Sequence, residues 1–132
     1  MTVRVTGLDH LVLRVSDVER SLAFYQDVLG LAGVRVEEWR RGEAFFPSVR
    51  VNDDVIIDIL AAPADPAGME RTANVDHFCL VVEPTDWDAV VAAGTFEVVD
   101  GPDTRFGAHG DAQSLYVRDP DRNVVELRYY PA

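Results

Sequence analysis

The stretch "LDHLVLRV", from Leu8 to Val15, has a close counterpart 67 residues later in "VDHFCLVV", from Val75 to Val82. In both stretches an Asp-His pair opens a run of branched apolar residues, which is typical of a β-strand. Two strands that begin with the same polar pair point to an internal duplication, because unrelated strands would share only their apolar character. The residues that follow each copy therefore indicate whether a whole module is repeated.

The first copy is followed by a segment with the pattern of an amphipathic helix, residues 16–30. Ser16 is the predicted N-cap, Glu19 completes a capping box three residues later, and Gly30 ends the helix. Apolar residues recur at helical spacing between these ends, which predicts one buried stripe. Three strand-like segments then follow, at residues 31–39, 43–51 and 54–62, separated by turn-forming residues.

The second copy is followed by the same order of elements. Residues 85–94 predict a shorter helix, with Thr85 as N-cap, Asp88 at the capping-box position and Gly94 at the end. Three strand-like segments come next, at residues 95–102, 112–119 and 123–130, and the turn "DPDRN" joins the last two.

The repeated order predicts an α+β fold in a single domain. The domain consists of two strand-helix-strand-strand-strand modules, at about residues 5–63 and 74–131, joined by a linker with two prolines. The sheet is expected to be mixed and curved, with the helices on its outer face.

Composition and charge exclude several classes of function. The chain of 132 residues carries a net charge of −11 and has no lysine. A chain this acidic repels phosphate backbones, which argues against a nucleic-acid partner, and the lack of lysine excludes lysine Schiff-base chemistry. Cys79 is the single cysteine, so no internal disulfide can form. Since neither a signal peptide nor a membrane-spanning segment is recognisable, a soluble cytoplasmic protein is expected.

Strand alternation predicts that three polar side chains share one side of the sheet. Successive side chains of a strand point to opposite faces, and the wholly apolar face is expected to pack against the helices. His10 and His77 occupy equivalent positions on the other face of the two repeated strands. Glu126 interrupts the apolar last strand and points away from its neighbours Val125 and Leu127. All three side chains are therefore expected on the concave side.

Two imidazoles and a carboxylate that converge on one cavity form a ligand set for a divalent transition metal. A carboxylate in an apolar strand is costly unless it is paired or binds a cation, which favours a functional role for Glu126. Asp58 lies in the corresponding strand of the first module and is a candidate fourth ligand. The alternative interpretation is that the Asp-His pairs are ordinary polar residues at the start of strands, inherited by duplication.

Three segments carry a resemblance to a known family: "GLDHLVLRVSDVERSLAFYQDVLGL", "DHFCLVV" and "SLYVRDPDRNVVEL". With them the chain resembles the vicinal oxygen chelate superfamily, also called the glyoxalase/bleomycin resistance/dioxygenase superfamily. The resemblance implies paired βαβββ modules that form a U-shaped cavity around a divalent metal ion (Fe, Zn, Ni, Co or Mn). It also implies His10, His77 and Glu126 as metal ligands, and a homodimer. Asp58 stands where many members have Glu or Gln, and Arg122 where the family turn has Gly.

Other residues are candidates for contact with a small-molecule substrate. Ser114 and Tyr116 share a face of the strand beside Glu126, and wall residues of a core are the alternative interpretation. Arg105, in a glycine-containing loop, could anchor a substrate carboxylate because the guanidinium matches carboxylate geometry. His109 is either a proton shuttle or an exposed loop residue.

The resemblance leaves the reaction open. A glyoxalase- or epimerase-like lyase or isomerase comes first, with Asp58 or Glu126 as the base that moves a proton between carbons. A ring-cleaving Fe(II) dioxygenase that uses His10, His77 and Glu126 is the second hypothesis. A non-catalytic antibiotic-binding resistance protein and a thiol transferase that acts on fosfomycin are the remaining alternatives. Whether one chain or two build each site is also open.

Overall fold

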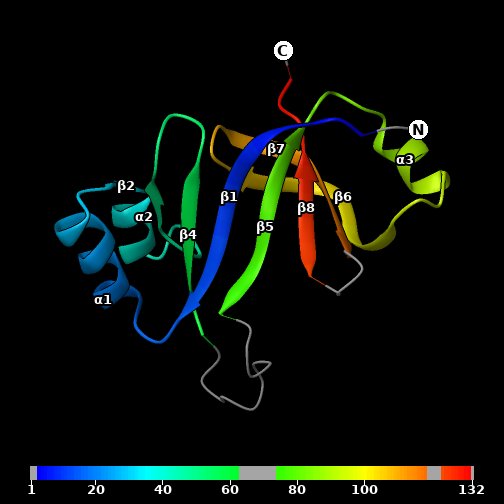
Figure 1. Ribbon diagram of the computed structural model, residues 1–132. Coiled ribbons are helices and arrows are strands. Elements are labelled where there is room, and N and C mark those ends of the chain that lie inside the picture. The colour runs from blue at the N-terminus through cyan, green and yellow to red at the C-terminus, as the bar shows by residue number, and fades with distance from the viewer. Residues whose placement is uncertain (1–2, 63–73, 119–122, 132) are drawn as a thin grey trace. The chain divides into compact units, whose positions relative to one another are not determined.

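The computed structural model describes residues 3–62, 74–118 and 123–131. Within these residues the fold is α+β, with eight strands, three short α-helices and one π-helical turn (Figure 1). Each half of the chain begins with a strand, continues with a helix and later adds three strands, as the repeat predicts. Most of the predicted linker and the turn with Arg122 lie outside the described residues.

The chain divides into two compact units, which do not correspond to its first and second halves. The first unit comprises Met1–His10 and His77–Ala132, and the second comprises Leu11–Asp76. Strand β1 (Val5–Val15) and strand β5 (Val75–Val82) contribute residues to both. The two βαβββ modules, at about residues 5–63 and 74–131, stay a prediction.

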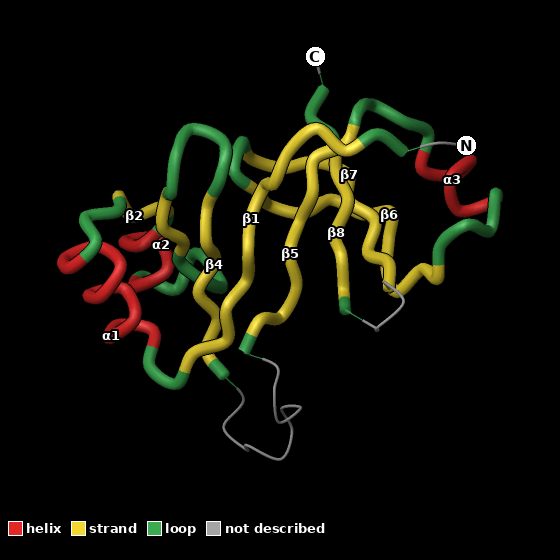
Figure 2. The backbone as a smooth tube through the Cα atoms, in the orientation of Figure 1, coloured by secondary structure: helices red, strands yellow, loops and turns green. Residues whose placement is uncertain are grey.

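The first unit is a mixed sheet with one helix. Besides parts of β1 and β5, it contains α3 (Trp87–Ala92), β6 (Glu97–Gly107), β7 (Gly110–Arg118) and β8 (Val124–Arg128). The strand order is β1-β5-β8-β7-β6, with β5 parallel to β8 and the β8-β7 and β7-β6 pairs antiparallel. Strands β6 and β7 form a long hairpin (Figure 2).

One face of this sheet is apolar and carries the core of the unit. Trp87 and Val90 of α3 are buried in a cluster with Leu115 and Leu127. Trp87 also donates its indole N–H to the backbone oxygen of Gln113 at 3.1 Å, so the buried polar atom is satisfied. Because side chains alternate along each strand, the residues between these apolar positions point to the opposite face.

The second unit holds the other helices and the antiparallel strands. Its elements are the end of β1, α1 (Val18–Ala23), the π-helix Phe24–Val28, β2 (Ala32–Val34), α2 (Val36–Arg40), β3 (Ser48–Arg50) and β4 (Ile56–Ala61). Strand β3 pairs antiparallel with both β2 and β4. Leu22, Val49 and Ile59 are buried together and form the centre of its core.

The prediction of a strand over residues 31–39 is wrong for its second half, which forms α2. Two valines favoured a strand, but acidic residues in the first turn of α2 and Arg40 in the last turn suit the helix dipole. Val36 and Trp39, three residues apart, both pack on the core of the second unit. Packing of that helical face overrides the β propensity of the valines.

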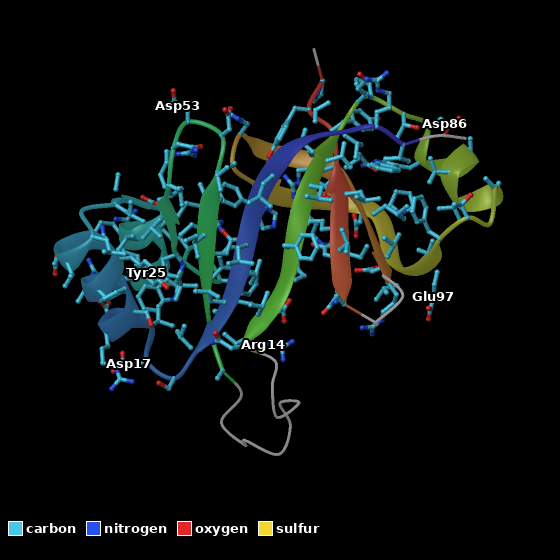
Figure 3. All side chains as sticks on the ribbon, in the orientation of Figure 1. Arg14, Asp17, Tyr25, Asp53, Asp86 and Glu97 are labelled. Atoms are coloured by element: carbon cyan, nitrogen blue, oxygen red, sulfur yellow. The ribbon has the colours of Figure 1, made fainter. Side chains whose placement is uncertain are left out.

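The predicted N-caps Ser16 and Thr85 are each wrong by one residue. Asp17 caps α1 by accepting from the backbone N–H of Arg20 at 3.1 Å, and Asp86 caps α3 in the same manner (Figure 3). Aspartate and serine or threonine are comparably good caps, so composition alone does not choose between adjacent candidates. Among the described residues, no helix is both long and apolar enough to cross a membrane.

Candidate metal centre

The structure brings His10, His77 and Glu126 together in the first unit. The Nε2 atom of His10 lies 3.1 Å from Oε1 of Glu126, and Nε2 of His77 lies at the same distance from the same oxygen. The two imidazole rings meet edge to face, with centroids 5.6 Å apart. Three potential ligand atoms thus converge from β1, β5 and β8, which are successive strands of the sheet (Figure 1).

The register of the sheet explains this convergence. Glu126 of β8 lies opposite Cys79 of the parallel strand β5 and opposite Tyr116 of the antiparallel strand β7. His77 stands two residues before Cys79, so both side chains project from the same face. Glu126 therefore lies between Cys79 and Tyr116, on the middle one of three neighbouring strands.

The donor set fits a divalent transition-metal ion. Nitrogen and oxygen donors bound to one ion at about 2.1 Å lie about 3 Å apart when they meet at a right angle. The observed spacing of 3.1 Å between each Nε2 and Oε1 agrees with that value. Two imidazoles and one carboxylate are suited to Zn, Fe, Ni, Co or Mn, and leave coordination positions for a substrate.

The second oxygen of Glu126 is held by the protein. Oε2 accepts from Ser114 Oγ at 2.8 Å and from Arg128 Nη2 at 2.6 Å and Nε at 3.2 Å. Burial raises the pKa of Glu126, but hydrogen bonds from the two histidines and the charge of Arg128 outweigh burial and hold the pKa below its usual range. The carboxylate is therefore ionised, with Oε1 alone turned toward the imidazoles.

Asp9, which the sequence interpretation assigned no role, holds the other side of His10. Its Oδ2 lies 2.6 Å from His10 Nδ1 and accepts from the backbone N–H of Ala108 at 3.0 Å. Its Oδ1 accepts from the hydroxyl of Tyr130 at 2.6 Å. Burial lowers the pKa of His10, but the hydrogen bonds with Asp9, Cys79 and Glu126 outweigh burial and raise the pKa to about 12.

Arg128 is the second residue of the candidate site that the sequence interpretation missed. It is fully buried, although arginine is seldom buried without a partner. Besides Glu126, it contacts the backbone oxygen of Phe106 at 3.0 Å and the hydroxyl of Tyr130 at 3.2 Å. One signal was available: Arg128 shares the face of Glu126 two residues later in the same strand.

Tyr116 lies beside His77, and Arg105 lies beside Tyr116. The ring of Tyr116 lies 5.4 Å from the ring of His77, and the Arg105 guanidinium lies 5.9 Å from the Tyr116 ring centre. The prediction that Arg105 lies in a loop is wrong, because β6 extends through it to Gly107. Arg105 also pairs with Asp100 and Asp103, each at 3.0 Å, so two carboxylates already balance its charge.

Three further residues named from the sequence have different surroundings. Asp58 belongs to the second unit, where it is buried and accepts from Ser48 Oγ at 2.5 Å; its role as ligand or base stays a prediction. Cys79 is fully buried, and burial raises the pKa of its thiol to about 11. His109 lies in the turn between β6 and β7, with its ring 5.2 Å from that of Tyr130.

Known proteins resemble the chain over most of its length. The virulence protein STM3117 of Salmonella typhimurium is 30% identical over 128 residues, which cover 96% of this chain and 85% of that protein. The glyoxalase domain-containing protein RDO1 of Mycosarcoma maydis is 31% identical over 128 residues, covering 96% of this chain and 69% of that protein.

Two solved structures share the fold at lower identity. The methylmalonyl-CoA epimerase of Mycobacterium tuberculosis has a TM-score of 0.65 and 19% identity, covering 100% of this chain and 93% of that chain. The Mn(II)-bound glyoxalase of Novosphingobium aromaticivorans has a TM-score of 0.65 and 21% identity, covering 97% of this chain and 40% of that chain.

The family assignment rests on a match that spans nearly the whole chain. The sequence model of one superfamily matches residues 7–127, a range that contains His10, His77 and Glu126. The name of the relative RDO1 agrees with this match. The chain belongs to the Glyoxalase/Bleomycin resistance protein/Dioxygenase superfamily.

Proposed function

We propose that the protein is a metal-dependent enzyme that moves a proton at a carbon next to a carbonyl group, as a lyase or isomerase of the glyoxalase or epimerase type. The observation that carries this proposal is the convergence of two imidazole Nε2 atoms on a single carboxylate oxygen, each at 3.1 Å. His10, His77 and Glu126 would hold the ion. The fold shared with an epimerase and with a Mn(II)-bound glyoxalase supports the same reaction class.

The bound ion would act as a Lewis acid toward two neighbouring oxygens of the substrate. The protein's part is to keep the ligands fixed. Ser114 and Arg128 hold Oε2 of Glu126, so the carboxylate can offer the ion only Oε1. Tyr116, beside His77, and Arg105, beside Tyr116, are the proposed substrate contacts.

The contacts of Glu126 favour a ligand over a base. Its lowered pKa makes it a weak base, because proton transfer is most efficient when the pKa lies near the working pH. Three donors from Ser114 and Arg128 also occupy Oε2. Of the two bases that the sequence names, we therefore propose Asp58 rather than Glu126 for proton transfer.

Isotope exchange tests the reaction class. Protein reconstituted with Co²⁺, Ni²⁺, Zn²⁺ or Mn²⁺ is incubated in D₂O with a hemithioacetal of methylglyoxal or with methylmalonyl-CoA. Deuterium should enter at the carbon beside the carbonyl with at least one pair of metal and substrate. His77→Ala should lose this exchange entirely, and Asp58→Asn should lose it while it still binds metal. An absence of exchange with every metal and both substrates would reject the lyase or isomerase assignment.

A second candidate function is an Fe(II) dioxygenase. Two histidines and one carboxylate with open positions are the ligand set of non-haem Fe(II) oxygenases, and the same three residues supply it here. Oxygen uptake by the anaerobically Fe(II)-loaded protein with a panel of catechols would establish this activity. If no catechol of the panel caused oxygen uptake and deuterium exchange occurred, the dioxygenase would be rejected and the lyase or isomerase assignment would stand.

Assembly and location belong to the same proposal. We infer a homodimer in the cytoplasm that acts on a small molecule, without a nucleic-acid or membrane partner, from the family resemblance and the net charge of −11. Light scattering of the purified protein at micromolar concentration tests the dimer, and a monomeric mass would contradict it.

A further inference from the structure

Five buried or half-buried side chains form a closed ring of hydrogen bonds at the candidate metal centre. His10 Nε2 lies 3.1 Å from Oε1 of Glu126, and Arg128 Nη2 donates to Oε2 of the same residue at 2.6 Å. Arg128 Nη1 then donates to the hydroxyl of Tyr130 at 3.2 Å. The hydroxyl donates to Asp9 Oδ1 at 2.6 Å, and Asp9 Oδ2 lies 2.6 Å from His10 Nδ1. The ring returns to the residue where it began.

Within this ring, Asp9 decides which nitrogen of His10 faces the centre. A carboxylate can only accept, so His10 Nδ1 must carry the proton that joins it to Asp9. By the same rule Nε2 carries a proton toward Glu126 in the metal-free protein. When an ion displaces that proton, Nε2 is the atom that binds the ion, while Asp9 keeps the proton on Nδ1 and fixes the orientation of the ring. Two further donors, Tyr130 and the backbone N–H of Ala108, keep Asp9 in this position.

Tyr130 connects the two ligands that lie farthest apart in the chain. Its hydroxyl accepts from Arg128, which orients Glu126, and donates to Asp9, which orients His10. A shift of either ligand therefore changes the hydrogen bonds that hold the other. His77 reaches the centre by another route, through its own contact with Glu126 and its ring contact with Tyr116.

We propose that Asp9 and Tyr130 are positioning residues that orient His10 and Glu126 as a coupled pair toward the metal ion, without contacting it. This inference rests on the proposed metal function. It predicts that removing either side chain's polar contact weakens metal binding and changes the ligand field, although His10, His77 and Glu126 are all still present. It also predicts that Asp9 and Tyr130 are not independent, because their contacts belong to one ring.

Co²⁺ binding tests the proposal, with affinity from calorimetry and the ligand field from the visible absorption spectrum. Asp9→Asn should weaken Co²⁺ binding about 10–100-fold, the usual effect of losing the outer partner of a ligating histidine. Tyr130→Phe removes one oxygen and should weaken binding several-fold, with an altered spectrum. The double variant should lose less affinity than the product of the two single losses.

Two matched variants control for general effects of these substitutions. Tyr129→Phe changes the neighbouring tyrosine, whose ring packs on Trp87 at 5.8 Å, and Asp76→Asn changes the equivalent residue of the second Asp-His pair. Both should retain the wild-type affinity and spectrum. Thermal unfolding of the metal-free variants separates loss of fold from loss of positioning, and if Asp9→Asn does not fold, Tyr130→Phe decides the question.

The possible results distinguish this inference from the proposed function. If the wild-type protein binds Co²⁺, and folded Asp9→Asn and Tyr130→Phe bind it with unchanged affinity and spectrum, the positioning role is refuted while the metal centre stands. If the wild-type protein does not bind Co²⁺, the metal centre and the positioning role both fail. Weaker binding with an altered spectrum in Tyr130→Phe, but not in Tyr129→Phe, supports the proposal.

Discussion

The two Asp-His pairs have nearly the same sequence and different surroundings. Asp9 is fully buried and turns to the histidine beside it, at 2.6 Å. Asp76 has a side chain that is 22% exposed and accepts from Arg14 Nε at 2.6 Å. The two histidines differ as well, since the side chain of His10 is 2% exposed whereas the side chain of His77 is 13% exposed.

The difference arises from residues that the repeat does not copy. Asp9 is held by Ala108, which follows the end of β6, and by Tyr130, which follows the end of β8. These partners are 99 and 121 residues away in the chain. Both strands thus bring an imidazole to Glu126, while their aspartates have different partners, His10 for Asp9 and Arg14 for Asp76.

The largest expected effect is the loss of metal from either histidine variant. His10→Ala and His77→Ala should each weaken Co²⁺ binding by more than about 100-fold, because outer-shell changes alone cost 10–100-fold. Calorimetry of each variant against the wild type measures the loss. A variant that retains wild-type affinity would remove that histidine from the ligand set.

Stability should distinguish the same two variants. His10→Ala leaves Asp9 and Glu126 without a shared buried partner and should lower the free energy of unfolding of the metal-free protein by about 3 kcal/mol or more. His77→Ala removes one hydrogen bond from a partly exposed ring and should cost about 1 kcal/mol. Urea denaturation without metal measures both, and equal losses would show that the two pairs are energetically alike.

Strand alternation and the repeat were sufficient to select His10, His77 and Glu126. Their side chains share a face of neighbouring strands, a relation that the period of two makes visible in the sequence. The order of strands and helices followed from the same repeat, with the exception of α2. That helix begins at the β-branched Val36, directly after β2, and packing against the second unit's core selects its conformation.

Asp9 and Arg128 could not be assigned from the sequence for a different reason. Alternation places Asp9 on the opposite face from His10, and a side-chain contact between adjacent residues is outside what the period describes. The burial of Asp9 depends on Tyr130 and on the backbone of Ala108, which no local pattern connects with it. Arg128 was visible as a charge beside Glu126, but its burial becomes evident only in the folded sheet.

The next effect is on the free energy of unfolding, and it concerns the two arginines that pair with acidic strand residues. Arg128→Met removes a buried cation that contacts the buried carboxylate of Glu126 and should destabilise the protein by about 3 kcal/mol. Arg14→Met breaks the partly exposed pair with Asp76 and should cost less than about 1 kcal/mol. Urea denaturation measures both, and comparable losses would contradict the contrast between the two pairs.

The pH dependence of the metal-free protein should follow from His10. Its pKa rises from 6.5 to about 12 on folding, so its contribution is complete below pH 6.5 and is lost as the pH rises toward 12. The free energy of unfolding should fall by about 1 kcal/mol per pH unit between roughly pH 7.5 and 9. At the acid end, the lowered pKa values of Asp9 and Glu126 contribute stability that is lost as the pH falls below 4.

Urea denaturation across pH 5–9 measures this slope, and His10→Asn is its control. The variant lacks the imidazole, so its stability should be nearly flat above pH 7. Added Co²⁺ should reverse the slope in the wild-type protein, because a ligating imidazole must lose its proton and metal affinity therefore rises with pH. A wild-type protein with flat stability from pH 7 to 9 would mean that Asp9 does not hold a proton on His10.

The smallest effect should come from Asp76→Asn, and its response to salt provides the sharpest comparison with Asp9→Asn. Asp76 and Arg14 have side chains that are 22% and 32% exposed, so neutralising Asp76 should cost less than about 1 kcal/mol. The difference from the wild type should shrink in 1 M NaCl, where the Debye length is about 3 Å. Asp9→Asn should cost about 1–3 kcal/mol at either salt concentration, because a buried carboxylate with three donors is shielded from the solvent ions. If salt reduced both differences equally, Asp9 would be as exposed to solvent as its counterpart in the second strand.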